Sequence, residues 1–126
     1  MESNRSRVSK TSILVFVRFL GGDMKESIYQ LRVTRRLEKE FPGCLVIPND
    51  PEFIQGIPDL LILFRNTWFM LEVKLAENSP IQPNQEYYVN LFNDMSFAMF
   101  IYPEIEDEVF DALQYTFCDS RSTRLS

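Results

Sequence analysis

The sequence predicts a single α/β domain in which helices cover a β-sheet, and three observations predict this class. The chain has 126 residues, the size of one ordinary domain. Apolar periodicity and the positions of Gly and Pro divide it into segments in the order α-β-β-β-α-β-α. Residues 97–102 are apolar on both faces, which is typical of a strand in the middle of a helix-covered sheet and implies a crossover connection from the strand before it.

Residues 24–41 are predicted to form the first helix, because Leu and Arg favour helices and Pro42 with Gly43 ends the segment. The apolar side of this helix is predicted to consist of Ile28, Leu31, Leu37 and Phe41. Glu26 lies on the side away from the basic residues of the helix, so its carboxylate is expected to face the body of the protein.

Three strands are predicted next, at residues 44–47, 59–64 and 68–74, and a loop through Gly56 joins the first two. Pro83 suits the first turn of a helix that runs to about Met95. The buried face of this helix is predicted to consist of Tyr88, Val89, Phe92 and Met95.

The last helix is predicted at residues 104–117, with acids in its first turn, where the helix dipole favours them. Its inward residues are predicted to be Ile105, Val109, Leu113 and Phe117. Residues 1–23 do not join the periodic pattern. The domain is therefore expected to span residues 24–117, with an N-terminal extension at 1–23 and a tail at 118–126.

Composition excludes several kinds of site. The chain has no histidine, which removes Ser-His and Cys-His nucleophiles and every His-ligated metal site. Cys44 and Cys118 lie far apart and indicate neither a disulfide framework nor a zinc site. No run is apolar and long enough for a membrane span, so we expect a soluble cytoplasmic protein (in the host cytoplasm if it is viral) with no membrane partner and no small-molecule cofactor. Any catalysis must use carboxylates, lysine and hard metal ions.

The formal net charge is −5, but the basic residues are concentrated. No Lys or Arg lies between residues 75 and 120, whereas acids are frequent there. Five basic side chains occupy an arc of about 100° on the first predicted helix. This basic stripe consists of Lys25, Arg32, Arg35, Arg36 and Lys39. It is either a DNA-binding surface that contacts phosphates or an ordinary solvated helix face.

The second and third predicted strands carry residues that can do chemistry. If residues 66–67 form a two-residue hairpin turn, Asp59 lies opposite Lys74. Glu72 then shares a face with Lys74 and lies diagonally across from Asp59, close enough for the two carboxylates to bind one ion. A three-residue turn would break this arrangement, because it would place Asp59 opposite Val73.

Two carboxylates and an ammonium on one apolar hairpin cost free energy unless they are paired. A divalent cation between Asp59 and Glu72 would neutralise them, and Mg²⁺ takes a few hard oxygens while keeping positions for water and substrate phosphate. Such a site suits phosphodiester hydrolysis, in which the metal polarises the phosphate and Lys74 positions water or neutralises developing charge. The alternative is a buried salt bridge between Asp59 and Lys74, with Glu72 at the edge of the sheet.

These residues together resemble a known family. Over residues 24–103 the sequence is similar to the VRR-NUC family of the PD-(D/E)XK nuclease superfamily. The similarity rests on four elements in order: a helix with an early Glu26, the run 56–59 (Gly-Ile-Pro-Asp), the run 72–74 (Glu-Val-Lys), and Gln85 after a Pro-Asn pair. The resemblance implies a restriction-endonuclease-like core, with a mixed central four-stranded sheet flanked by helices, and DNA cleavage that depends on Mg²⁺ or Mn²⁺.

The resemblance also implies roles for single residues. Asp59, Glu72 and the main-chain carbonyl of Val73 would be metal ligands, and Glu26 a further acid near the metal. Asp59, Glu72, Lys74 and Gln85 would form the catalytic set. Small stand-alone members of the family, from phages and bacteria, are similar to resolvase-like enzymes that act as homodimers on branched DNA.

Three functions remain open from the sequence. The first is a structure-specific DNA endonuclease of replication, recombination or repair. The second is a catalytically idle DNA- or protein-binding module, in which Glu26 is a helix N-terminal acid and Gln85 caps a loop. The third is an acidic DNA mimic, suggested by 15 acidic against 7 basic residues in 24–117. A mimic needs acids over its whole surface, whereas an endonuclease needs them away from the basic stripe.

Overall fold

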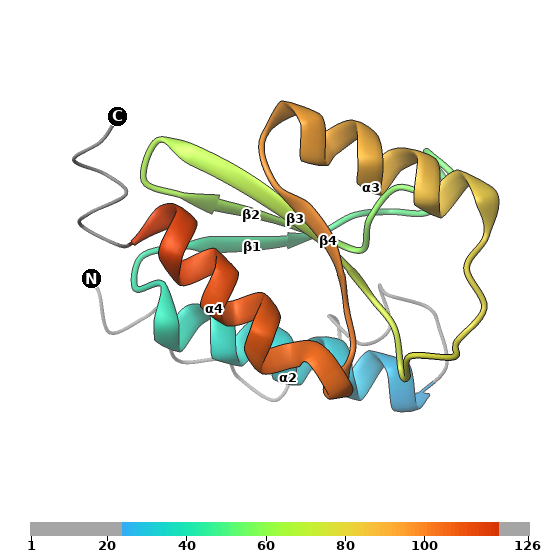
Figure 1. The fold of residues 1–126 in the computed structure, drawn as a ribbon, viewed down its shortest axis with the longest axis horizontal. Helices are drawn as coiled ribbons and strands as arrows, with labels where there is room; N and C mark the ends of the chain where they lie inside the picture. The colour runs from blue at the N-terminus through green and yellow to red at the C-terminus, as the bar shows by residue number, and fades with distance from the viewer. Residues whose placement is uncertain (1–23, 119–126) are drawn as a thin grey trace.

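The computed structural model describes residues 24–118, which form a four-stranded sheet with helices on both sides (Figure 1). The elements are α2 (Met24–Glu40), β1 (Leu45–Pro48), β2 (Leu60–Phe64), β3 (Thr67–Val73), α3 (Pro83–Met95), β4 (Ala98–Ile101), a 3₁₀ turn (Pro103–Ile105) and α4 (Glu106–Phe117). This confirms the predicted α/β class and the predicted order of elements. The predicted N-terminal extension, and all but the first residue of the predicted tail, lie outside the described residues. Within residues 24–118, no helix has the length and apolar character needed to cross a membrane.

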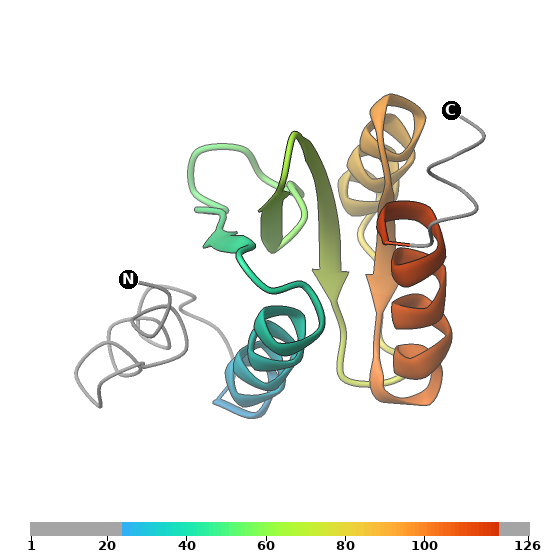
Figure 2. The same cartoon turned by 90° about the vertical axis from the view of Figure 1, so that its left-hand side faces the viewer.

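The sheet combines antiparallel and parallel pairing. β1 pairs antiparallel with β2 and β2 with β3, whereas β4 pairs parallel with β3 after the chain crosses over through α3. The order β1-β2-β3-β4 can be followed in Figure 2 from the teal β1 to the orange β4. The crossover confirms one prediction from residues 97–102, but their predicted place in the middle of the sheet is wrong, because β4 is an edge strand. α3 packs on one face of β4 and α4 on the other, so even this edge strand is apolar on both faces.

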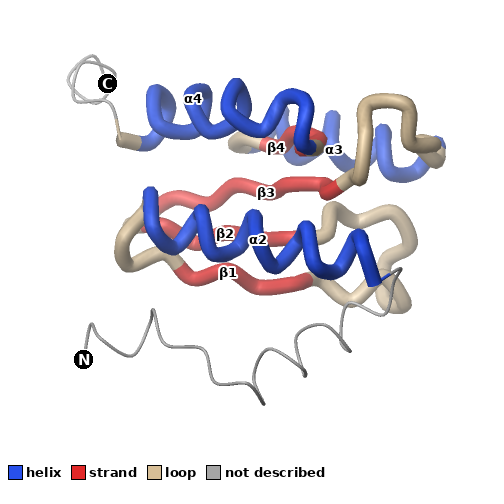
Figure 3. The backbone as a smooth tube through the Cα atoms, turned by 90° about the horizontal axis from the view of Figure 1, so that it is seen from below, coloured by secondary structure: helices blue, strands red, loops and turns tan. Residues whose placement is uncertain are grey.

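The two faces of the sheet carry cores of different size. α2 and α4 cover one face, and α2 crosses in front of the strands in Figure 3, whereas α3 covers the other face. Side chains alternate along β3, so Phe69, Leu71 and Val73 join the larger core under α2 and α4, and Met70 joins the smaller core under α3. Glu72 follows Met70 on the α3 face. The smaller core therefore ends in polar residues at the end of β3.

α2 buries a different stripe from the predicted one. Its buried apolar residues, with Phe41 just beyond its end, are Tyr29, Val33, Leu37 and Phe41. Ile28, predicted inward, is 56% exposed. Tyr29 lies inward instead of Ile28, because it precedes Val33 by four residues and so lies on the same helix face as the other buried side chains. Its hydroxyl also donates a hydrogen bond to the buried Glu106. In α3, Met95 is likewise predicted to be buried but is 61% exposed in the last turn.

The hairpin between β2 and β3 turns at Arg65 and Asn66, one residue earlier than predicted. Phe64 pairs with Thr67, and the two residues between them form the turn. Arg65 adopts the left-handed conformation, with φ of +57°, which is uncommon for a residue other than Gly, Asn or Asp.

This turn corrects the predicted pairing without changing the predicted face. Extending the register from Leu60 and Leu71 by one position places Asp59 opposite Glu72, whereas the sequence predicted Asp59 opposite Lys74. The predicted and observed turns both contain two residues, so the alternation of side chains is unchanged. Asp59, Glu72 and Lys74 therefore lie on one face of the hairpin.

Candidate active site

The predicted acids meet at the end of the sheet where β2 begins and β3 ends. Asp59 precedes β2, and its Oδ2 accepts a hydrogen bond of 2.9 Å from the backbone N–H of Val73. The carbonyl of Asp59 accepts a second hydrogen bond of 2.8 Å from the backbone N–H of Asn49, which fixes the end of the preceding loop. Glu72 lies opposite and is only 3% exposed. Two carboxylates are thus held on one face by backbone pairing.

Gln85, in the first turn of α3, connects the carboxylate of Glu72 and the ammonium of Lys74 to this helix. Its Nε2 donates a hydrogen bond of 2.9 Å to Glu72 Oε2. Its Oε1 accepts from the backbone N–H of Gln82 at 2.9 Å, which caps the helix, and from Lys74 Nζ at 3.3 Å. Lys74 is buried and also donates to the carbonyl of Pro80. The first turn of α3 therefore orients the side chains of Glu72 and Lys74.

The direct ion pair that the sequence left as an alternative is not observed. Among residues 24–118, no salt bridge joins Lys74 to Asp59 or to Glu72. The positive charge of Lys74 acts on both acids at longer range and favours their ionised forms. The two acids are therefore only partly compensated.

Burial and nearby negative charge hold both acids toward their protonated forms. Burial raises the pKa of Glu72 most, and the charge of Asp59 raises it further. Burial also raises the pKa of Asp59, against the hydrogen bond from Val73, and the charge of Glu26 raises the pKa of both acids. Glu26 thus acts on the site from the first turn of α2, as expected from its side of the helix. A cation placed between these groups would reverse this effect.

The chemistry of the donor set fits a divalent cation that prefers oxygen. Glu72 Oε1 is buried and has no hydrogen-bond partner, so one hard oxygen at the site is unsatisfied. Within residues 24–118 no three His, Cys, Asp or Glu side chains lie close enough together to hold an ion by themselves. Asp59 and Glu72 are therefore a pair, and further ligands would have to come from a main-chain carbonyl, water and substrate. Mg²⁺ commonly binds through one or two carboxylates with water and phosphate oxygens, so the residues fit this ion.

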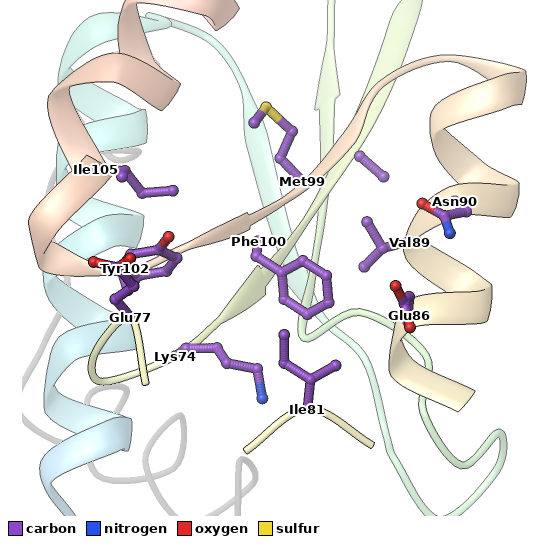
Figure 4. Close-up of a pocket in the computed structure, with 11 residues that line it drawn as sticks. Lys74, Glu77, Ile81, Glu86, Val89, Asn90, Met99, Phe100, Tyr102 and Ile105 are labelled. Atoms are coloured by element: carbon purple, nitrogen blue, oxygen red, sulfur yellow. The ribbon is translucent and has the colours of Figure 1, made fainter. Parts of the chain in front are cut away.

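Two cavities of about 340 Å³ each meet at Lys74. One contains Glu26, Gln85 and the loop before α3. The other is mostly apolar and lies between α3, β4 and the 3₁₀ turn that precedes α4, with Phe100 in the middle of its lining and Glu86 and Val89 on its α3 side (Figure 4). Lys74 therefore stands between the carboxylate site and an apolar wall.

The structure ties Arg36 of the basic stripe firmly to α4, whereas Arg32 reaches the same helix only at its edge, with Nη2 3.7 Å from Glu106 Oε1. Lys25, Arg32, Arg35 and Lys39 are exposed along α2. The Arg36 guanidinium is instead tied to three carboxylates, which are Glu40 at 2.7 Å, Glu106 at 2.8 Å and Asp107 at 2.8 Å. It also lies 4.1 Å from the centre of the Phe110 ring. Arg36 joins α2 to α4 and is not placed with the exposed cations.

Two contributions to the site were missed from the sequence. Asn84, next to Gln85, donates a hydrogen bond of 3.1 Å to the carbonyl of Gln55 and so ties α3 to the loop before Asp59. Gly56 packs so closely there that a Cβ would lie 2.7 Å from the Asn84 side chain, and its φ is +93°. The sequence indicated a turn at Gly56, but no local pattern indicates a contact with a residue so distant in the chain.

Comparisons with known proteins find two solved structures that share this fold. No family model matches the sequence, and no curated protein sequence is similar to it. A solved structure described as a VRR_NUC domain is 27% identical, with a TM-score of 0.50, over 64% of this chain and 91% of that chain. A second, described as a VRR_NUC domain protein, is 20% identical, with a TM-score of 0.54, over 76% of this chain and 90% of that chain. Both share the fold of this chain.

Proposed function

We propose that this chain, which shares its fold with two solved structures described as VRR_NUC domains, is a metal-dependent endonuclease that hydrolyses phosphodiester bonds in DNA. The observation that carries the proposal is the pair of half-buried Asp59 and buried Glu72, with one unsatisfied carboxylate oxygen on Glu72 and a buried lysine on the same face. A protein gains nothing in stability from such an arrangement unless a cation completes it. The same side chains are the ones that the resemblance assigns to catalysis.

Each residue of the site has a separate task in the proposed reaction. Asp59, Glu72 and the carbonyl of Val73 would hold Mg²⁺ or Mn²⁺, which would polarise the phosphate and lower the pKa of a water. Lys74 places its ammonium where negative charge develops on the phosphate. Gln85 holds the side chains of Glu72 and Lys74 in fixed positions relative to each other through one hydrogen bond to each. The charge of Glu26 reaches the same carboxylates from α2.

The proposed substrate is branched or otherwise non-B DNA, bound by a homodimer in replication, recombination or repair. The exposed cations of α2 support phosphate contacts, because Lys25, Arg32, Arg35 and Lys39 are concentrated on one helix while α4 carries acids and no basic residue. This asymmetry favours an endonuclease over a DNA mimic, which would need acids on every side. A small domain presents little surface to two duplex arms, which favours two copies per junction.

The test is cleavage by the purified chain of labelled four-way junctions, flaps, nicked duplexes and linear duplexes. We expect cleavage with Mg²⁺ or Mn²⁺ and none in excess EDTA, because the chain has neither a histidine nor an activated cysteine to replace a metal-bound water. Lys74→Ala should lower the single-turnover rate, whereas Glu86→Gln, which changes an exposed acid on the same helix turn as Gln85, should not. Full activity in EDTA, or equal loss in both variants, would contradict the proposal. Sedimentation at tens of micromolar checks the dimer.

A further inference from the structure

An exposed apolar tip lies in the loop between β1 and β2, just before the first acid of the candidate site. Phe53 is 88% exposed and its neighbour Ile54 is 43% exposed. Covering these two side chains would gain free energy, since burying a Phe or Ile side chain contributes about 2 kcal/mol. We refer to Phe53 and Ile54 as the apolar tip.

The loop that carries the apolar tip is closed at its base. The Asn49 side chain donates a hydrogen bond of 2.8 Å to the carbonyl of Pro58, and the Asn49 backbone N–H donates one of 2.8 Å to the carbonyl of Asp59. Near the tip, the Phe53 N–H donates to the carbonyl of Asp50 at 3.2 Å. The tip is therefore held out by a structured loop.

The same loop is tied to the candidate active site from the side. Asn84 binds the carbonyl of Gln55, and the next residue of α3, Gln85, binds Glu72. The loop passes beside the N-terminal end of α3, where it is drawn in green in Figure 1. Phe53 precedes Asp59 by six positions, so the tip lies within about 20 Å of the carboxylates along the chain. At about 3.4 Å per nucleotide, this corresponds to about six nucleotides from the cleaved phosphate.

The negative charge of the loop around the apolar tip determines which part of DNA the tip can contact. Residues 49–58 contain no Lys or Arg but two acids, Asp50 and Glu52, so the loop is unsuited to phosphate contacts. Every nucleobase has an apolar face, and aromatic side chains bind unstacked bases without a need for positive charge. Apolar side chains inserted at a base step also hold the step open.

We propose that the apolar tip packs against unstacked bases within about six nucleotides of the cleaved phosphate. The proposal rests on the nuclease function above and deepens it by naming the residues that recognise the substrate. Opening a base step in continuous duplex costs a few kcal/mol, whereas a flap or junction already presents unstacked bases. The apolar tip therefore favours branched DNA over continuous duplex.

The test compares single-turnover cleavage, with Mg²⁺ or Mn²⁺, of a flap or junction and of a linear duplex with the same sequence. We expect Phe53→Ser to lower the rate on branched DNA by about tenfold or more, which matches the loss of one base-aromatic contact, and to leave the rate on linear duplex nearly unchanged. Phe53→Trp should retain the preference. Tyr115→Ser removes an aromatic side chain of α4 that is 55% exposed and serves as the matched control, with no expected change.

A second readout follows the bases themselves. The fluorescence of 2-aminopurine placed within six nucleotides of the cut in a flap should rise when the wild-type protein binds, because the base leaves its stack, and should rise less with Phe53→Ser. If the wild-type protein cuts but Phe53→Ser behaves like Tyr115→Ser in both assays, the inference is wrong and the nuclease function stands. If Phe53→Ser instead turns a sedimenting dimer into a monomer, the tip is a contact between copies and the inference is also wrong. If the wild-type protein cuts no DNA with either metal, the nuclease function itself fails.

Discussion

Among residues 24–118, two glutamates are buried, one at the end of the sheet and one between α2 and α4. Glu72 is 3% exposed and Glu106 is 7% exposed. Glu106 has a partner on each oxygen, since Oε1 accepts from the Tyr29 hydroxyl at 2.9 Å and Oε2 from Arg36 at 2.8 Å. Glu72 has Gln85 on one oxygen and nothing on the other.

The comparison separates a carboxylate that joins elements from one that is available for chemistry. The partners of Glu106 come from α2, so its hydrogen bonds hold two helices of the larger core together. Glu72 lies opposite a second acid, Asp59, whose charge adds to burial in raising the pKa of Glu72. The two glutamates are therefore buried to a similar degree, but only Glu106 has a hydrogen-bond partner for each of its carboxylate oxygens.

The largest expected effect concerns activity at the end of the sheet. Glu72→Ala or Asp59→Ala should lower metal-dependent cleavage to about a thousandth of wild type or less, because several kcal/mol of electrostatic stabilisation of the transition state depend on the bound ion. The fold should survive, since removing one acid also removes the repulsion between the two. Single-turnover cleavage and circular dichroism measure the two effects. Loss of several kcal/mol of folding stability with cleavage intact would mean that Glu72 resembles Glu106.

The next effect concerns stability at the contact between α2 and α4. Glu106→Ala should lower the free energy of unfolding by about 2 kcal/mol, because it leaves Arg36 and the Tyr29 hydroxyl without their buried partner. Asp107→Ala removes an 88% exposed partner of Arg36 and should cost less than about 0.5 kcal/mol. Urea denaturation measures both variants. Cleavage by Glu106→Ala, assayed well below its melting temperature, should match wild type.

A smaller effect should appear as a pH dependence of stability without metal. The pKa of Glu72 is raised in the folded state, so the folded protein keeps a proton that the unfolded chain releases, and stability falls as pH rises from about 5 toward 8. Glu72→Gln removes this loss. It should be about 1 kcal/mol more stable than wild type at about pH 8 without metal and equal to it near pH 5. Thermal unfolding in EDTA checks this, and a constant difference across the range would mean that titration of Glu72 is not the cause.

The smallest effect separates two neighbouring arginines of α2. Arg35→Ala should leave the melting temperature unchanged and reduce the slope of log binding constant against log salt by about one unit, because an exposed phosphate contact releases about one counterion. Arg36→Ala should lower the melting temperature instead, because it removes the guanidinium that binds three carboxylates. DNA binding at several salt concentrations, combined with calorimetry, distinguishes them. The same result for both variants would mean that the basic stripe acts as one surface.

The sequence predicted the class, the elements and the shared face of the acids, because these depend on local signals. Period-two alternation, Pro and Gly positions and the even length of the turn do not require knowledge of the tertiary structure. Even with the turn displaced by one residue, Asp59, Glu72 and Lys74 remained on one face. The site residues themselves stay predictions until the variants are assayed.

The errors came from features that depend on distant parts of the chain. Arg65 adopts an unusual positive φ, which no local pattern indicated, so the register moved and Asp59 came to lie opposite Glu72. Arg36 reads as one cation of a basic stripe, but its partner Glu106 comes from a helix 70 residues later. β4 reads as a central strand because two helices cover it, although it lies at an edge. Each error reflects tertiary packing that overrides a correct local signal.

The parallel pairing of β3 with β4 has a consequence for how the domain opens. The β1-β2-β3 meander is built from neighbouring segments, whereas β4 can pair only after α3 has crossed over, so its contacts close a longer loop. The core that holds α3 against the sheet also has fewer buried residues, three against the fifteen of the larger core. Local opening should therefore release α3 and β4 as one cooperative unit while the meander stays closed. Gln85 belongs to α3, so this local opening would break its hydrogen bonds to Glu72 and Lys74. Amide hydrogen exchange in residues 83–101 would measure how often the candidate site opens in this way without global unfolding.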